Sequence, residues 1–224
     1  MIPDTAVYAA ELEAVLPASI PNRPSVVRKS AHHLRRIAEV NPSMNLTRVI
    51  EPRAAAIKHV FDSLLPWEEI QGNDRILDIG TGAGFPGLPL AAAFPRQRFV
   101  LVESVKKKAA FVESTVEALD LPNVEVLDRR AEEVLRERRF SLTLARAVAP
   151  IHRLLKLLGP TIERCGAILL YKGPEVETEL AEAAPELKRY RLAPRVFTYE
   201  LPGGLGIRRL VRLTRAPGLG LTPR

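Results

Sequence analysis

The residues with the clearest chemical signal form a short glycine-rich segment in the first half of the chain. Asp78 stands two positions before Gly80, and Gly82 and Gly84 follow at alternate positions. Because glycine has no Cβ atom, such a segment can turn sharply and approach a ligand closely. The carboxylate can accept hydrogen bonds from the cationic amino-acid end of S-adenosylmethionine, directly or through water, which it could not do for a pyrophosphate. The segment therefore favours a sulfonium cofactor.

A dinucleotide cofactor is the main alternative for this segment. Gly82, Gly84 and Gly87 fit the GxGxxG pattern of nicotinamide-dependent oxidoreductases. The register argues against this reading, because the first glycine after the predicted strand is Gly80 and the third glycine counted from there would be Phe85. Phe85 and the proline after it would also crowd the helix terminus where a pyrophosphate binds.

Two later segments supply further candidate contacts with the cofactor. Glu103 ends the second predicted strand, about 20 residues beyond the glycines, where a carboxylate can accept from both ribose hydroxyls of either cofactor. Ala131 and Glu132 follow the third predicted strand, near the expected position of an adenine. Taken alone, Glu132 is better explained as a negative charge at a helix N-terminus.

The residues around the fourth and fifth predicted strands limit what could be methylated. No Asn-Pro-Pro-Tyr or Asp-Pro-Pro-Tyr motif follows the fourth strand, which disfavours an amine acceptor. Methylation of a pyrimidine carbon needs a thiolate, and Cys165 has no neighbouring histidine in sequence, so we interpret it as a small core residue. A guanine N7 carries a lone pair and needs alignment rather than a general base. Arg146, which closes the fourth strand, is the first candidate for a substrate contact, with a salt bridge at a strand end as the alternative.

A parallel α/β sheet would bring these residues together, and the larger part of the chain predicts one. Short apolar runs alternate with amphipathic segments, and the last two runs follow each other across a glycine turn. We therefore expect a Rossmann-like α/β domain over residues 71–224, with a seven-stranded, mostly parallel sheet and an antiparallel last strand. The strands that this pattern defines are residues 75–79, 98–103, 124–127, 141–145, 167–171, 195–201 and 208–213.

The first 70 residues predict an N-terminal helical extension. Residues 1–24 combine a short apolar-periodic piece with three prolines, which indicates a loose helix and a proline-rich connection. Apolar residues at helical spacing predict helices over residues 25–41 and 52–65. At 100° per residue, His59 and Asp62 fall opposite the apolar stripe of the second helix, and this pattern by itself indicates a solvated face.

Composition and charge limit the partner and the compartment. The 33 basic and 26 acidic residues give a net charge of +7, which suits a polyanionic partner and is as typical of an ordinary basic surface. A single cysteine allows no intramolecular disulfide, and the N-terminus lacks the pattern of a secretion signal, so we expect a cytoplasmic protein. No apolar run is long enough to span a bilayer. The histidines show no zinc spacing, so we expect no metal site and interpret His32 and His33 as surface residues.

With these residues in place, the chain resembles the RsmG (GidB) family of bacterial 16S ribosomal RNA guanine N7 methyltransferases. The resemblance extends from about residue 45 to residue 213 and depends on motifs in a fixed order. These motifs are NLT from Asn45, HVFDS from His59, DIGTGAGFPGLPL from Asp78, VESVKKKAAFVE from Val102, RAEE from Arg130, ARAVAP from Ala145, and Lys172 with Gly173. The chain departs from the family pattern at Ser141, where aspartate is usual, and at Arg129, where glycine is usual.

The resemblance implies a class I methyltransferase that acts on 16S rRNA of the small ribosomal subunit, and we expect a monomer that needs neither a metal nor a membrane. It implies transfer from S-adenosylmethionine to N7 of guanine 527 (rRNA numbering) in the 530 loop, with S-adenosylhomocysteine as the product. The implied cofactor contacts are Asp78, Gly80, Gly82, Gly84, Phe85 in the pocket wall, Glu103, Ala131, Glu132 and, bordering both ligands, Arg146. The implied substrate or catalytic contacts are His59, Asp62, Lys107, Arg146, Lys172 and Arg208. A methyltransferase of the same fold that acts on a small molecule or a protein is the alternative.

Overall fold

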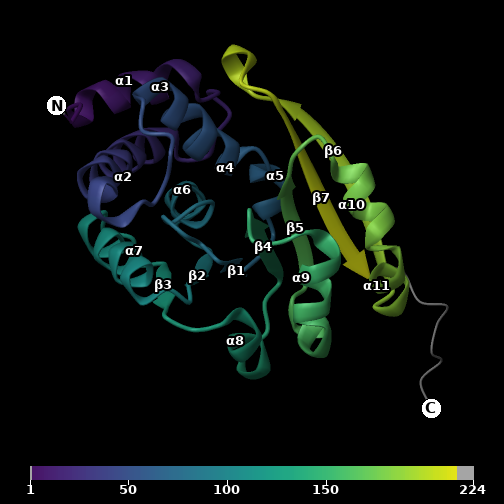
Figure 1. Cartoon of the computed structure of the whole chain (residues 1–224). Helices are drawn as coiled ribbons and strands as arrows, with labels where there is room; N and C mark the ends of the chain where they lie inside the picture. The colour runs from purple at the N-terminus through teal and green to yellow at the C-terminus, as the bar shows by residue number, and fades with distance from the viewer. Residues whose placement is uncertain (1, 216–224) are drawn as a thin grey trace.

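The computed structural model describes residues 2–215, and a single seven-stranded sheet crosses this part of the chain (Figure 1). The strand order is β3-β2-β1-β4-β5-β7-β6. Strands β1 to β5 are parallel, and β7 is antiparallel to both of its neighbours. The predicted α/β fold with an antiparallel last strand is therefore confirmed. The strands are β1 Arg75–Ile79, β2 Arg98–Val102, β3 Val124–Leu127, β4 Leu142–Arg146, β5 Ala167–Lys172, β6 Leu192–Glu200 and β7 Ile207–Arg215.

Small shifts of the strand boundaries matter for the site. β4 and β5 each extend one residue beyond the predicted end, so that Arg146 and Lys172 are the last residues of their strands. β6 begins at Leu192, three residues earlier than predicted, because it is an edge strand that tolerates Pro194. The strand order reverses beside β1, and in open parallel sheets ligands bind at the carboxyl ends of the strands at such a point.

Helices cover both faces of the sheet (Figure 1). The N-terminal helices, α6 and α7 share one hydrophobic core with the sheet, and α8 to α11 share the other. None of the helices in residues 2–215 is long and apolar enough to cross a membrane. The helices are α1 Thr5–Val15, α2 Arg23–Met44, α3 Pro52–Ala55, a π-helix Ala56–Phe61, α4 Asp62–Leu64, α5 Trp67–Ile70, α6 Gly87–Ala93, α7 Lys106–Ala118, α8 Ala131–Glu137, α9 Ile151–Leu158, α10 Val176–Glu182 and α11 Ala184–Arg189, with 3₁₀ turns at Gly159–Arg164 and Pro202–Gly204.

Alternate residues of the central strands belong to opposite cores. Ile76 packs in the core on the side of the N-terminal helices, whereas Leu77 packs in the core on the side of α8 and α9. Burial on both faces explains why these strands are continuously apolar in sequence. The N-terminal segment is packed more firmly than predicted, because Tyr8 and Leu12 of α1 are buried in the first core.

The polar side of the helix over residues 52–64 is not a solvated face. Asp62 and Ser63 are buried, and His59 is mostly covered. Two physical reasons explain the difference from the pattern. The π-helical stretch changes the rotation per residue, so positions counted at 100° drift along the helix. This side of the helix also lies against β4, β5 and β7. Arg146 of β4 and Arg208 of β7 pair with Asp62, and the Tyr171 hydroxyl of β5 donates to the Ser63 carbonyl oxygen.

Candidate functional site

The glycine-rich segment forms a tight loop between β1 and α6. Gly80, Gly82 and Gly84 have positive φ angles of 63°, 60° and 97°, which other residues adopt only at a cost. Space is also restricted, because a Cβ atom on Gly84 would lie 2.5 Å from Leu88 Cδ1, and one on Gly80 would lie 3.2 Å from Val148 Cγ2. Backbone conformation and packing both require glycine in this loop.

Asp78 lies beneath the loop and is fully buried. Its Oδ2 atom accepts hydrogen bonds from Thr81 Oγ1 at 2.7 Å and from the Gly87 amide at 3.0 Å. Burial raises the pKa of this carboxyl to about 7, although these hydrogen bonds act in the opposite direction. Oδ1 is buried without a hydrogen-bond partner. In this conformation Asp78 organises the loop, and its contact with the amino group of a cofactor stays a prediction, because Oδ1 would first have to become accessible.

Glu103, the first residue after β2, connects the loop to the neighbouring strand. Its Oε2 atom accepts from the Gly82 amide at 3.1 Å and its Oε1 atom accepts from the Val105 amide at 2.9 Å. Each carboxylate oxygen keeps a free lone pair, and the residue is 7% exposed. This arrangement leaves the carboxylate able to accept from a pair of ribose hydroxyls.

A small pocket of about 100 Å³ lies at the carboxyl ends of β1 and β2. Its walls are mainly apolar, and Val148 and Leu157 are 37% and 44% exposed there. Neither residue is predicted as a ligand contact from the sequence, because Leu157 lies outside the motifs and Val148 is an ordinary apolar residue within ARAVAP. The apolar walls suit a flat adenine ring, and the open space beside Gly82 and the carboxylate of Glu103 suit the rest of S-adenosylmethionine. The full lining is Ile79, Gly80, Val102, Ser104, Arg129, Arg130, Ala131, Glu132, Val148 and Leu157.

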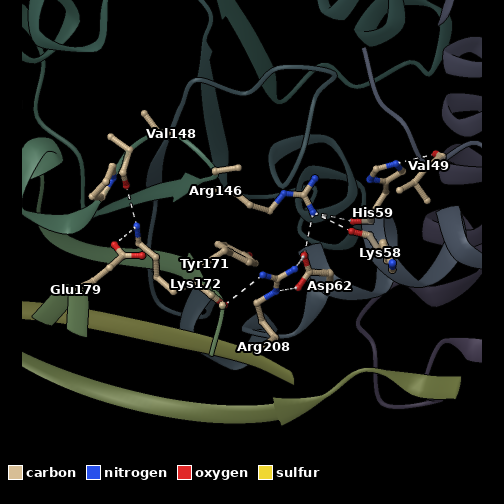
Figure 2. A pocket seen from close by; sticks show the side chains of 14 residues that line it. Val49, Lys58, His59, Asp62, Arg146, Val148, Tyr171, Lys172, Glu179 and Arg208 are labelled. Atoms are coloured by element: carbon tan, nitrogen blue, oxygen red, sulfur yellow. Dashed lines mark hydrogen bonds and ion pairs between the residues drawn. The ribbon is translucent and has the colours of Figure 1, made fainter. Parts of the chain in front are cut away.

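Val148 also borders a larger cavity of about 600 Å³, at the carboxyl ends of β4 and β5 (Figure 2). Four cationic side chains and two carboxylates face this cavity, and an excess of positive charge favours an anionic ligand. The cations are Lys58, Arg146, Lys172 and Arg208, and the carboxylates are Asp62 and Glu179. The other lining residues are Val49, His59, Ala147, Val148, Ala149, Pro150, Tyr171 and Gly173.

Asp62 holds two arginines at one wall of this cavity (Figure 2). Arg208 donates to it from Nε at 2.5 Å and from Nη2 at 3.0 Å, and Arg146 donates from Nη1 at 3.2 Å. Arg146 Nη1 also lies 3.3 Å and 3.4 Å from the carbonyl oxygens of Lys58 and His59. Burial lowers the pKa of Arg146, and the Asp62 carboxylate acts against this shift. Two interpretations of Arg146 follow from the sequence, a salt bridge at a strand end and a substrate contact. Arg146 forms the salt bridge, and it also lines the cavity where a substrate contact would be made.

Lys172 fixes the loop that follows β4. Its Nζ atom donates to the Ala149 carbonyl oxygen at 2.8 Å and to Glu179 Oε2 at 2.7 Å. The same Glu179 oxygen accepts from the amide of Ile151, the first residue of α9, at 2.9 Å. Within this loop Ala147 has a φ of 56°, which only a well-held backbone maintains. Glu179 is not among the residues predicted from the sequence, because no motif relates a residue of α10 to this loop.

Phe85 joins the glycine-rich loop to the N-terminal helices. Its ring stacks on His33 and His59 at centroid distances of 4.5 Å and 4.9 Å, and Arg146 Cζ lies 5.2 Å from its centre. His33 is fully buried and its Nε2 atom lies 2.7 Å from the Ala83 carbonyl oxygen, so the prediction of a surface residue is wrong. The reason is that α2 packs this side chain onto the loop. Burial lowers the pKa of His33 to about 3 and that of His59 to about 4, so both rings are neutral at pH 7.

Of the other residues considered in the sequence, His59 lines the cavity, whereas Lys107 and Cys165 lie away from it. His59 lines the cavity, and its Nε2 atom lies 3.1 Å from both Thr47 Oγ1 and the Val49 carbonyl oxygen. Lys107 is exposed in the first turn of α7 and lines neither pocket, so the structure does not bring it together with Arg146. Cys165 is fully buried, and burial raises its pKa to about 12, which confirms its interpretation as a core residue.

Comparisons with known proteins agree with this architecture. The family model described as "GidB: rRNA small subunit methyltransferase G" matches residues 27–197. A protein of Solibacter usitatus named "Ribosomal RNA small subunit methyltransferase G" is 47% identical over 207 residues, which are 92% of this chain and 99% of that protein. A protein of the same name from Sorangium cellulosum is 41% identical over 75% of this chain and 73% of its own length. Among solved structures, an O-methyltransferase from Bacillus cereus in complex with SAH aligns over 94% of this chain and 97% of its own, with a TM-score of 0.60 and 18% identity, and shares the fold.

Proposed function

The chain belongs to the rRNA small subunit methyltransferase G (GidB) family, and we propose that it transfers the methyl group of S-adenosylmethionine to N7 of guanine 527 in 16S rRNA. The observation that carries this proposal is the cationic cavity, whose lining residue Arg146 lies 5.2 Å from the ring centre of Phe85 in the glycine-rich segment. Guanidinium and ammonium groups bind phosphate oxygens and carbonyl oxygens such as guanine O6. A nucleotide is therefore the ligand that this lining suits best.

The cofactor would occupy the small pocket and the loop on the other side of Val148. The apolar walls would hold the adenine, Glu103 would accept from the ribose hydroxyls, and the backbone of the glycine-rich loop would contact the amino-acid part. When bound, S-adenosylmethionine supplies an electrophilic methyl group next to the larger cavity. Phe85 would keep this junction closed to water, because its buried ring lies between two neutral histidines and Arg146.

The chemistry that the cavity residues can perform is alignment rather than proton removal. His59 has a pKa lowered to about 4 and its Nε2 atom is already within hydrogen-bond distance of two oxygens, so it is poorly placed as a base. Asp62 already accepts from two arginines. Guanine N7 needs neither group, because its own lone pair attacks the methyl group. Arg146 would donate to guanine O6 and hold N7 in line, and Asp62 would keep that guanidinium in place.

The positive lining also bears on release of the product. An N7-methylated guanine carries a positive charge that the substrate base lacks. The four cations that line the cavity would therefore hold the methylated base less tightly than the substrate. Asp62 and Glu179 limit this repulsion, since each is paired with cations of the same lining.

A methyl-transfer assay on ribosomal particles tests the proposal. Purified protein, S-adenosylmethionine with a labelled methyl group and 30S subunits that lack the modification should give labelled 16S rRNA. Cleavage at N7-methylguanine by borohydride and aniline should map the label to guanine 527. Arg146→Gln should reduce transfer by at least about 100-fold, as for loss of an electrostatic transition-state donor, and change the cofactor Kd by less than about threefold. Arg136→Gln, which removes an exposed charge of α8, is the matched control. Labelling of no ribosomal particle, or of an amine or carbon position, would refute the assignment.

A further inference from the structure

A second polar pocket lies at the opposite end of the sheet from the site described above. It has a volume of about 350 Å³ and is lined by residues at the amino ends of β1, β2 and β3. β1 runs five residues from Arg75 in this pocket to Ile79 beside the cofactor pocket. At about 3.3 Å per residue, the two ends of the strand lie about 13 Å apart. Ligands in the two places would therefore be separate.

Two arginines stand side by side in this pocket. Arg75 and Arg98 are paired in register between the parallel strands β1 and β2, and both are exposed. In-register residues of adjacent strands point to the same face of the sheet at a strand spacing of about 4.8 Å. Like charges on neighbouring strands repel each other, and an anion bound between them would remove this repulsion. The sheet register therefore places like charges together around a hollow.

No carboxylate of the described residues satisfies these two arginines. Neither has an acidic partner within 4 Å among residues 2–215, and the Arg75 guanidinium instead lies 5.8 Å from the ring centre of Phe140. Glu125 lines the same pocket, but its carboxylate accepts from Arg138 Nη1 at 2.6 Å. The pocket therefore keeps two positive charges available to an external anion.

The floor of the pocket is rigid. Asn123 Nδ2 lies 3.1 Å from each of the carbonyl oxygens of Ala91, Phe94 and Gln97, and so fixes the connection between α6 and β2. Phe99, which also lines the pocket, is only 1% exposed. A fixed floor holds the two strand ends, and with them the arginine backbones, at one separation. The fixed backbone limits the ordering on binding to the two side chains, and the planar guanidinium fork loses less entropy for each hydrogen bond it forms than a lysine ammonium does.

We propose that Arg75 and Arg98 form a second phosphate-binding site, which holds a backbone phosphate of the RNA substrate away from the reacting base. This inference rests on the proposed function, which supplies RNA as the ligand. Planar guanidinium forks bind the oxygens of one phosphate with several hydrogen bonds. The site would add affinity for the ribosomal particle without touching the methyl-transfer step, so it would act on KM and not on kcat.

The test compares two double variants in equilibrium binding to 30S subunits over a range of KCl concentrations. Arg75→Gln with Arg98→Gln should weaken binding about tenfold at moderate salt and reduce the slope of log K against log [KCl] by about 0.7 to 0.9, as for loss of one phosphate contact. The value of kcat at saturating 30S subunits and the cofactor Kd should not change. The control, Arg136→Gln with Lys188→Gln, removes the same charge from exposed positions that line no described pocket, and should change binding less than twofold.

The outcomes separate this proposal from the proposed function. An equal loss in the control would mean that only net charge matters, and an unchanged affinity in the test variant would mean that no RNA phosphate binds there. Either result overturns the site. A second measurement tests whether a small phosphate compound binds in this pocket instead of RNA. It follows the NMR signals of the arginine Nε atoms during titration with inorganic phosphate and with guanosine monophosphate. Tight binding of the mononucleotide with unchanged RNA affinity would assign the pocket to a free nucleotide and also refute the proposal. If the wild-type protein methylates no ribosomal particle but its RNA affinity still depends on the two arginines, the proposed function fails and the site stands.

Discussion

Replacing Asp62 by asparagine should destabilise the protein strongly, although the substitution changes neither the size nor the shape of the side chain. Asp62 is 1% exposed and is the carboxylate shared by Arg146 and Arg208. Asparagine keeps one oxygen acceptor but replaces the other oxygen by an NH₂ donor, which would face a guanidinium group. The two arginines would then lie together with no negative charge between them.

The structure sets the size of the effect. Removing one partner of a buried ion pair costs about 3–5 kcal/mol. The Arg146 and Arg208 side chains are 15% and 23% exposed, so water compensates part of the loss. We therefore expect a decrease of about 3 kcal/mol in the free energy of unfolding, at the lower end of that range. For a chain of this size, such a decrease lowers Tm by about 6–12 °C.

Urea unfolding followed by fluorescence measures this quantity, because Trp67 is the single tryptophan and is half-buried in α5. Glu68→Gln, at an exposed carboxylate on the same helix, is the matched control and should cost less than about 0.5 kcal/mol. A double-mutant cycle with Arg208→Gln should give a coupling energy of at least about 1 kcal/mol. A loss below 1 kcal/mol in Asp62→Asn, or a coupling energy near zero, would refute the view that this carboxylate organises the two arginines.

Three further predictions concern the loops and the pH dependence. Gly84→Ala should lower the free energy of unfolding by about 1–3 kcal/mol and weaken cofactor binding in calorimetry, because its Cβ atom would lie 2.5 Å from Leu88 Cδ1. The control is Gly72→Ala, where φ is also positive but the space is open, and it should leave cofactor binding unchanged. Glu179→Gln should lower kcat about tenfold through loss of about 1.5 kcal/mol of charge-assisted hydrogen bonding and leave the cofactor Kd within twofold, and an unchanged kcat would contradict this role. The raised pKa of Asp78 means that the native carboxyl keeps its proton from about pH 4 to pH 7 while the unfolded chain releases it, so its contribution to stability is lost as the pH rises through this range. Between pH 5 and pH 8, Asp78→Asn should therefore gain about 2–3 kcal/mol relative to the wild type in urea unfolding, and parallel pH profiles of the two proteins would exclude this explanation.

Features of this protein that depend on short-range order could be predicted from its amino-acid pattern alone. Apolar runs of strand length alternating with helical segments were enough to predict the seven strands, most within one residue, and the antiparallel end of the sheet. The glycine-rich loop could also be predicted, because the left-handed backbone at Gly80, Gly82 and Gly84 is a local requirement. Arg146 could be placed at a strand end for the same reason, since strand ends follow from local periodicity.

Contacts between side chains from distant segments could not be predicted in this way, because they depend on how the elements pack. Asp62 and Arg208 are 146 positions apart, and a helix before the sheet and its last strand contact each other only after the sheet has formed. The apolar stripe of the helix over residues 52–64 is buried as predicted, but its polar side is buried as well, because Arg146 and Arg208 from distant strands pair with Asp62 there. The burial of His33 could not be predicted, because periodicity shows which residues share a face of a helix but not what that face contacts. Burial of a polar group depends on partners from distant segments, and those partners are fixed by packing rather than by neighbouring residues.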